Sequence, residues 1–281
     1  MIIFKKAEVL NAYLTKKRSE GKNIGFVPTM GALHTGHLTL IETCRRDENL
    51  CVCSIFVNPT QFNDPKDFLK YPVTIENDIY LLEKNGADIL FLPLKDEIYP
   101  NGTNNLAHYE LGYLESLLEG KYRPGHFQGV CQVMERLLHI VAPDHLYMGQ
   151  KDYQQCMVVK RLLQITKSKM IFHTVPTVRE PDGLAMSSRN TRLNEDDRKK
   201  AVTIYKTLLF LKQNLMPGDL FSLSLQAANM LTAEHFKVDY VAIADADTLE
   251  PVEVWNGKQP LVALIAAFLH EVRLIDNMML V

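Results

Sequence analysis

The sequence contains few cysteines and no pair of them in a C-x-x-C arrangement. The five cysteines are Cys44, Cys51, Cys53, Cys131 and Cys156. An odd number without closely spaced pairs argues against a disulfide framework and against a structural zinc site. Because Cys51 and Cys53 alternate within CVCSIFV, we expect them on one face of a strand, as small buried hydrophobic side chains.

The chain also lacks a long apolar run and a strong net charge. Its longest apolar stretch is LVALIAAFL at 261–269, whereas a membrane-spanning helix needs about 20 residues. The segment MIIFKKAEVL is charged at Lys5, too early for the apolar part of a signal peptide. A net charge of −2 gives no overall attraction to nucleic acid or anionic lipid. We therefore expect a cytoplasmic protein with no membrane or nucleic-acid partner.

Strand-like and helix-like segments alternate over residues 1–176. Strands are expected at 24–28, 50–59, 88–93, 144–149 and 169–176, with helices between them at 36–47, 71–87, 129–143 and 153–166. This alternation is typical of parallel β-α-β units, so we expect an α/β fold with a Rossmann-like, doubly wound parallel sheet. Ligands of such sheets bind at the carboxyl ends of the strands.

The pattern changes after Pro176. A polar segment at 178–197 is followed by helices near 195–214 and 219–235, and then by strand-like runs to the end of the chain. Helices followed by strands indicate a small α+β domain. We therefore expect two domains: a Rossmann-like nucleotide-binding catalytic domain at 1–176 and a smaller α+β carboxyl-terminal domain at 177–281.

The stretch PTMGALHTGHL (28–38) lies where the first of these parallel strands passes into its helix. It has no G-x-G-x-x-G fingerprint but contains H-x-G-H, with His34, Gly36 and His37. A helix N-terminus suits phosphate, and two imidazoles can donate hydrogen bonds to the charge that develops in nucleotidyl transfer. Two ordinary histidines, or metal ligands completed from elsewhere, are the alternatives; no HExxH spacing supports a metal.

Four further stretches carry groups suited to a small anionic or polar ligand. MGQKDYQQ (148–155) places a lysine at a strand end, and GLAMSSRN (183–190) combines two hydroxyls with an arginine. FVNPTQF (56–62) carries a glutamine at the ligand-facing edge, and GKYRPGHFQGV (120–130) resembles a mobile cationic flap. Taken alone, GLAMSSRN is also compatible with an ordinary loop and MGQKDYQQ with a solvated turn.

Taken together, these motifs resemble a known family. H-x-G-H and the M-S-S-R loop are similar to the HIGH and KMSKS signatures of the nucleotidylyltransferase superfamily. The order and spacing of PTMGALHTGHLTLI, FVNPTQF, RPGHFQGV, GQKDYQQ and VREPDGLAMSSRN resemble the pantothenate synthetase (pantoate–β-alanine ligase) family over about residues 24–195. One departure is Gln150, where that family often has glutamate, which puts any acidic role at this position in doubt.

The resemblance implies an AMP-forming ligase. It implies that ATP, with Mg²⁺, activates (R)-pantoate as pantoyl adenylate, that β-alanine then displaces AMP to give pantothenate, and that the enzyme is a homodimer. No covalent enzyme intermediate is needed, which fits a sequence without a nucleophile elbow or an activated cysteine.

The resemblance also implies roles for individual residues. The catalytic residues would be His37, the proposed proton donor, with His34, Lys151 and Arg189. The ATP site would comprise Met30, Gly31, Ala32, Leu33, His34, Thr35, Gly36, His37, Gly149, Gln150, Lys151, Asp152, Val178, Met186, Ser187, Ser188 and Arg189. Pantoate and β-alanine would be bound by Gln61 and Gln155, with Arg123 and His126 nearby, and Asp78 would contribute to Mg²⁺ binding.

Other functions fit part of the pattern. A small nucleotidylyltransferase acting on a phosphorylated substrate would explain the histidines and the M-S-S-R loop, but not the glutamines of FVNPTQF and GQKDYQQ. A tRNA synthetase would need an anticodon-binding domain and a basic face. A non-catalytic nucleotide-binding protein of the same fold would show no turnover, so an activity assay separates it.

Overall fold

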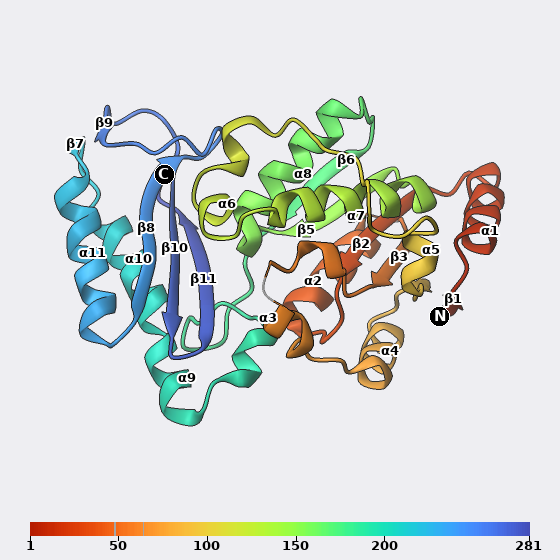
Figure 1. Ribbon diagram of the computed structural model, residues 1–281, viewed down its shortest axis with the longest axis horizontal. Helices are drawn as coiled ribbons and strands as arrows, with labels where there is room; N and C mark the ends of the chain where they lie inside the picture. Colours follow the sequence, from red (N-terminus) through yellow and green to blue (C-terminus); the bar gives the residue numbers. More distant parts are fainter. Residues whose placement is uncertain (48, 64) are drawn as a thin grey trace. The chain divides into compact units, whose positions relative to one another are not determined.

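The computed structural model describes residues 1–47, 49–63 and 65–281 (Figure 1). Contacts between Cα atoms divide the chain into two compact units. The N-terminal unit comprises Met1–Gln150 and Gln154–Pro176, and the C-terminal unit comprises Lys151–Tyr153 and Thr177–Val281.

A six-stranded parallel sheet forms the centre of the N-terminal unit. Its order is β1 (Ile2–Phe4), β4 (Ile89–Phe91), β3 (Leu50–Ile55), β2 (Ile24–Thr29), β5 (His145–Gly149) and β6 (Ile171–Val175). The chain runs outward from β2 to β3 and β4 on one side, and from β5 to β6 on the other. The order therefore reverses between β2 and β5, where doubly wound sheets bind their ligands. The expected doubly wound fold is confirmed.

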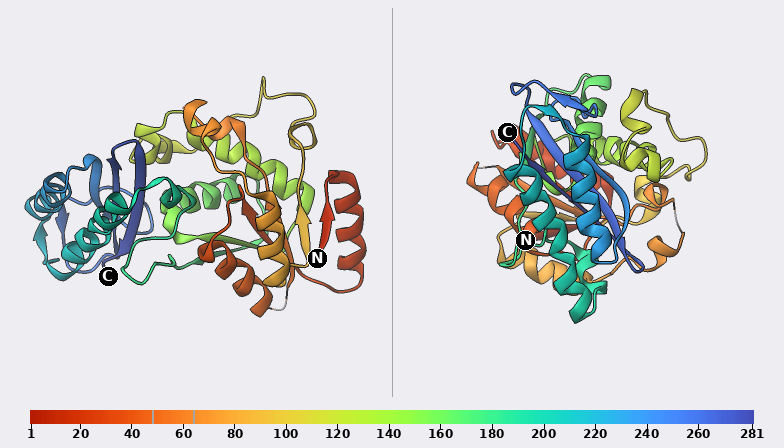
Figure 2. Two further views of the ribbon diagram at one scale, coloured as in Figure 1. Left: turned by 90° about the horizontal axis from the view of Figure 1, so that it is seen from below. Right: turned by 90° about the vertical axis from the view of Figure 1, so that its left-hand side faces the viewer.

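Helices cover both faces of this sheet (Figure 2). Leu40, Ile41 and Cys44 of α2 (Thr35–Arg46) and Leu82 of α4 (Ile75–Lys84) pack on one face in a single buried cluster. Two further helices, α1 (Ala7–Ser19) and α7 (His126–Val141), pack against each other. The remaining helical segments are η1 (Pro59–Gln61), α3 (Pro65–Leu69), α5 (Lys95–Ile98), η2 (Gly112–Glu115), α6 (Glu119–Tyr122), η3 (Gln150–Asp152) and α8 (Tyr153–Ile165).

All five cysteines are buried, as expected for Cys51 and Cys53, and no disulfide joins them. Cys51 and Cys53 of β3 belong to the same buried cluster as Cys44. Burial raises the pKa of the Cys53 thiol well above its ordinary value. A thiol that stays protonated at neutral pH is a poor nucleophile, which excludes Cys53 from covalent catalysis.

The C-terminal unit is a layer of helices on an antiparallel sheet. The sheet has the order β11 (Val272–Met279), β10 (Leu261–Leu269) and β8 (Lys237–Asp245). Three helices precede it or pack on it: α9 (Glu195–Ala201), α10 (Thr203–Gln213) and α11 (Phe221–Ala233). The expected small α+β arrangement is confirmed. Asn194 caps α9 by accepting a hydrogen bond from Asp197 N, as its position before three acidic residues predicts.

Some elements differ from the sequence predictions. Helix α7 begins at His126 rather than 129, because Gly125 adopts a left-handed conformation (φ +78°) immediately before it. The predicted helix at 195–214 is two helices that meet at Val202. The polar segment 95–125 contains the short α5, η2 and α6, and the two-residue strands β7 (Gly218–Asp219) and β9 (Val254–Trp255) were not predicted. Among the described residues, no helix is both long and apolar enough to span a membrane.

A stack of rings between β5 and β6 gives a testable pH effect. Tyr147 and His173 stack with centroids 4.4 Å apart, and His145 Nδ1 lies 2.9 Å from His173 Nε2. Burial, and then the charge of His145, lowers the pKa of His173 below its ordinary 6.5, with a smaller opposing effect of Asp47. Below about pH 6.5 the unfolded chain therefore binds the proton more readily, and stability falls as the pH decreases.

We expect the variant His173→Phe, which keeps the stacked ring, to lose less stability than the wild type between pH 7.5 and 5.5. Urea unfolding midpoints at the two pH values measure this difference. His139→Phe, at an exposed position, is the matched control and should behave as the wild type does. If the wild type and His173→Phe lost the same stability on acidification, His173 would not be the source of this pH dependence.

Candidate active site

The loop between β2 and α2 has an unusual backbone. Gly31 and Ala32 are both left-handed, with φ of +85° and +49°, and the second of these is a conformation that residues with a side chain rarely adopt. The carboxylate of Asp78 on α4 accepts Ala32 N at 2.9 Å and Leu33 N at 2.8 Å. Two successive N–H groups pointing at one carboxylate stabilise this conformation. Asp78 therefore fixes the loop that leads into the histidine motif.

This geometry gives Asp78 a structural role, and the predicted contribution of Asp78 to magnesium binding stays a prediction beside it. Its side chain is fully buried, and Oδ1 also accepts a hydrogen bond from Thr74 Oγ1 at 3.1 Å. Both carboxylate oxygens are thus used by protein donors. Within residues 1–47, 49–63 and 65–281, no three His, Cys, Asp or Glu side chains are grouped so that they could hold a metal ion. Asp78 therefore holds the loop, and whether it also binds Mg²⁺ is not decided by these contacts.

The two histidines lie at the N-terminus of α2. His34 Nδ1 accepts Gly36 N at 3.2 Å, and His37 Nδ1 accepts His34 N at 3.3 Å, which together form a capping box. A neutral imidazole that accepts at Nδ1 carries its proton on Nε2. Both rings are therefore held as Nε2–H donors, with centroids 4.1 Å apart, at a helix end where the backbone favours anions. Thr35 and Gly36 form the first turn of this helix.

Gln61 is buried beside the same loop. Its Nε2 donates to Met30 Sδ at 2.9 Å, and its Oε1 accepts from Asn58 Nδ2 at 3.3 Å. Asn58 also donates to Gly129 O at 3.0 Å and accepts from Tyr99 Oη at 2.9 Å. The sequence analysis assigned no role to Asn58. Gln61 is thus oriented by Met30, which is distant in the sequence, and by Asn58, which Gly129 and Tyr99 hold in turn.

Arg123 and His126 also belong to the surroundings of Gln61. Arg123 Nη1 lies 3.1 Å from His126 Nε2, and His126 Nδ1 lies 2.7 Å from the backbone oxygen of Gln61. Because arginine can only donate, His126 Nε2 accepts and Nδ1–H donates to Gln61 O. Arg123 also pairs with the buried Glu119, with Nη1 3.6 Å from Oε2. In the structure these two residues support the backbone of Gln61.

The segment after β5 holds the other glutamines. Gln154 is buried on α8, accepts Glu119 N and donates to Leu114 O and Leu117 O, each at 2.9 Å. The predicted ligand Gln155 is half-buried next to it. A Cβ added to Gly149 would meet no atom within 4 Å, so there is open space beside this residue and the backbone is accessible to a ligand.

The residues predicted for one ATP site are found in both units. Gly149 and Gln150 belong to the N-terminal unit, whereas Lys151 and Asp152 belong to the C-terminal unit with the M-S-S-R loop. Lys151 is half-buried and Asp152 is exposed.

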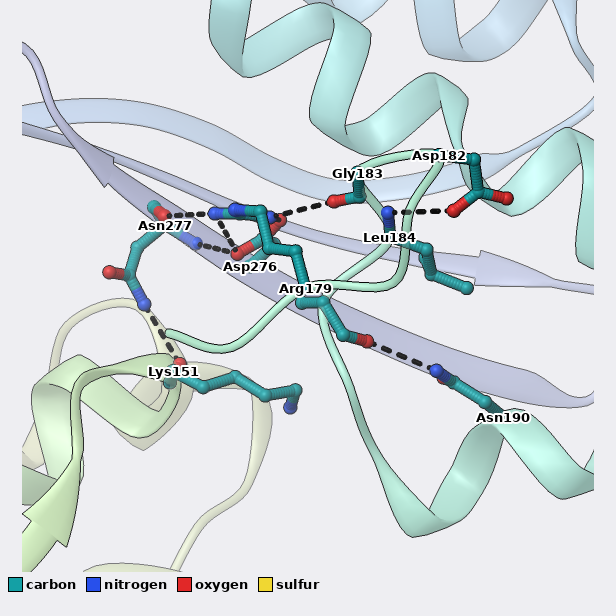
Figure 3. Close-up of polar contacts among 9 residues, drawn as sticks. Lys151, Arg179, Asp182, Gly183, Leu184, Asn190, Asp276 and Asn277 are labelled. Atoms are coloured by element: carbon teal, nitrogen blue, oxygen red, sulfur yellow. Dashed lines mark hydrogen bonds and ion pairs between the residues drawn. The ribbon is translucent and has the colours of Figure 1, made fainter. Parts of the chain in front are cut away.

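The loop that carries Met186–Arg189 is a tight hairpin-like structure (Figure 3). Val178 O accepts Met186 N at 3.0 Å, and Glu180 N donates to Leu184 O at 2.8 Å. Asn190 Nδ2 donates to Ala185 O at 3.0 Å. These contacts fix both ends of the segment 186–189.

Within that segment, two serines and an arginine begin a 3-10 helix, η4 (Ser188–Arg192). Ser187 caps it by accepting Arg189 N at 3.2 Å. Ser188 and Arg189 are half-buried, so the hydroxyl and guanidinium groups of this turn lie at the surface of the unit on a fixed backbone.

These features define a doubly wound α/β protein with a cluster of hydrogen-bond donors at the junction of β2 and α2. A sequence model of the family described as pantoate-beta-alanine ligase matches residues 2–279. Among curated relatives, the pantothenate synthetase of Cytophaga hutchinsonii is 40% identical over 284 residues, 100% of both chains. That of Fervidobacterium nodosum is 44% identical over 264 residues, 93% of both chains.

Solved structures show similarity to the same family. The pantothenate synthetase from Thermus thermophilus has 41% identity and a TM-score of 0.90, covering 100% of this chain and 99% of that one. The pantoate-beta-alanine ligase from Francisella tularensis, complexed with beta-gamma ATP and beta-alanine, has 35% identity and a TM-score of 0.84, covering 100% and 98%. The chain belongs to the pantoate–β-alanine ligase family.

Proposed function

We propose that this protein joins (R)-pantoate to β-alanine, forming pantothenate, AMP and pyrophosphate from ATP. The observation that carries the proposal is the full-length relationship to pantothenate synthetases at about 40% identity. The complex of the Francisella tularensis ligase with ATP and β-alanine supports two of the substrates. The donors at the start of α2 support a reaction at phosphate.

The proposed first step is adenylation. A carboxylate oxygen of pantoate attacks the α-phosphorus of ATP, and the bond from that phosphorus to pyrophosphate breaks. Negative charge develops on the phosphoryl oxygens and on the leaving pyrophosphate. The Nε2–H groups of His34 and His37, with Lys151 and Arg189, are the donors and cations that we assign to this charge. His37, the predicted proton donor, would act in this step by donating a hydrogen bond through its Nε2–H.

The proposed second step forms the amide. The β-alanine amine attacks the carbonyl carbon of pantoyl adenylate, AMP leaves with the bonding electrons, and the new amide nitrogen loses a proton. We assign Gln61 and Gln155 to pantoate, because an amide both donates to and accepts from hydroxyl and carboxylate groups. Gln61 would also meet β-alanine, and Arg123 and His126 support its backbone.

ATP is proposed to enter as its magnesium complex, so that Mg²⁺ is part of the substrate. Protein sites for Mg²⁺ commonly supply one or two carboxylates, while phosphates and waters complete the octahedron. Asp78 is the residue that we propose to contribute to binding of the ion. Homodimer formation and the division into a catalytic domain at 1–176 and a smaller domain at 177–281 stay predictions.

The test of this function is ATP–pyrophosphate exchange with purified protein and Mg²⁺, without β-alanine. We expect exchange that requires pantoate, and release of AMP and pantothenate once β-alanine is added. If another acid or a phosphate ester supported exchange instead of pantoate, that compound would take the place of pantoate as the proposed substrate. An absence of exchange with every substrate would overturn the enzymatic function and leave a nucleotide-binding protein.

A further inference from the structure

Strand β11 carries two buried polar residues, Asp276 and Asn277. Their exposed fractions are 4% and 2%. Neither belongs to a motif that the sequence analysis associated with function. A carboxylate and an amide are costly to bury unless their hydrogen bonds are satisfied, so their partners indicate what they do.

Asp276 holds the guanidinium of Arg179 in a two-pronged ion pair (Figure 3). Nη1 lies 2.6 Å from Oδ2, and Nη2 lies 3.1 Å from Oδ1. Arg179 also donates to Gly183 O at 3.1 Å and to Asn277 O at 3.2 Å. Its guanidinium carbon is 4.6 Å from the centroid of the Tyr205 ring. The Arg179 side chain thus joins β11 to the first strand and to the turn, at Gly183, of the hairpin-like loop that ends in Met186–Arg189.

Asn277 acts on a different segment. Its Nδ2 donates to the backbone oxygen of Lys151 at 2.8 Å. Figure 3 shows the Asn277 amide directed at Lys151 and Asp276 directed at Arg179. This divergence follows from strand geometry, since consecutive side chains leave a strand on opposite sides. One dipeptide therefore holds the backbone of Lys151 and the loop of Ser187–Arg189.

We propose that Asp276 and Asn277 are positioning residues for binding of the ATP phosphates. The inference rests on the proposed function, in which Lys151 and Ser187–Arg189 contact these phosphates. By holding both segments on one rigid strand, the dipeptide sets the spacing between the lysine and the loop. A displacement of about 1 Å in such groups costs up to roughly 10²-fold in rate.

The test is pantoate-dependent ATP–pyrophosphate exchange by Asn277→Leu, which keeps the size of the side chain and removes its donor. We expect the exchange rate to fall roughly tenfold to a hundredfold, with an unchanged KM for pantoate. Leu231→Val, in the buried core of the same unit, is the matched control: it lowers the unfolding temperature without changing exchange.

A double-mutant cycle separates positioning from general destabilisation. In the background of Lys151→Ala, Asn277→Leu should cause little further loss of exchange rate, because the lysine side chain that Asn277 positions is already absent. The same loss in both backgrounds, or a normal rate in Asn277→Leu, would overturn the inference for Asn277 while leaving the proposed function intact. A wild-type protein without pantoate-dependent exchange would overturn the proposed function and this inference with it.

Arg179→Lys tests the Asp276 contact. It keeps the positive charge but loses the two-pronged geometry. We expect Arg179→Lys to lower the rate of ATP–pyrophosphate exchange. Lys206→Arg, which replaces one cationic side chain by another on α10, should leave this rate unchanged. Normal exchange by Arg179→Lys would overturn the role of Asp276.

Discussion

Replacement of His37 by alanine should lower kcat by roughly 10²- to 10³-fold, and replacement of Lys151 by alanine should do the same. Each side chain is assigned to charge that develops only in the adenylation transition state, where such an interaction is worth about 3–4 kcal/mol. Because His37 Nδ1 accepts His34 N, its Nε2 carries the proton that reaches the phosphate. The Lys151 ammonium would neutralise the departing pyrophosphate.

Steady-state kinetics and circular dichroism of both variants test this prediction. The spectra should match that of the wild type, since neither side chain belongs to a buried core. Thr39→Ala on α2 and Lys199→Ala on α9 are matched controls and should turn over normally. Near-normal kcat in both His37→Ala and Lys151→Ala would contradict the assigned roles.

Replacement of Asp78 by alanine should lower the free energy of unfolding by about 2–6 kcal/mol. The change leaves the N–H groups of Ala32 and Leu33 without their acceptor, and each unsatisfied buried group costs about 1–3 kcal/mol. The left-handed backbone of Ala32 also loses its support, so the loop before His34 and His37 should rearrange. We therefore expect a loss of activity that exceeds the fraction of unfolded protein.

Urea unfolding and kcat of Asp78→Ala are compared with those of Glu76→Ala, an exposed acidic residue in the same first turn of α4. The control should differ from the wild type by less than about 0.5 kcal/mol. Asp78→Asn, which keeps one acceptor, separates the loop role from magnesium binding. Restoration of the activity of Asp78→Asn by excess Mg²⁺ would support the predicted contribution of Asp78 to Mg²⁺ binding.

The sequence was sufficient for the sheet and for the motifs at its edge. Buried β-branched runs and alternating helical segments specify a doubly wound fold through local chemistry. The hydrogen bonds that support the site could not be predicted from local sequence patterns, because they join segments that are distant in the sequence. Asn58 bonds to Gly129, Asp78 to Ala32, and Asn277 to Lys151. The residue types were visible, but a single sequence does not specify which backbone group each of them meets.

Glutamines 154 and 155 illustrate the same limit. The motif drew attention to Gln155, whereas Gln154 is the one that anchors the segment around Glu119 with three hydrogen bonds. Adjacent residues of a helix differ by about 100° in direction, so one of the pair is buried when the other is only half-buried. The short strands β7 and β9 are too brief to produce a periodic pattern at all.

Strand β10 has a consequence for how newly made chains reach the native state. It joins β11 through the two-residue turn His270–Glu271, but its other partner, β8, is separated from it by residues 246–260. A local hairpin forms in about 1–10 μs, ahead of pairing across a longer connection. Until β8 arrives, one edge of LVALIAAFL is open to the same segment of another molecule, as in the cross-β pairing of amyloid. The yield of folded protein at high concentration therefore depends on how quickly β8 closes that edge.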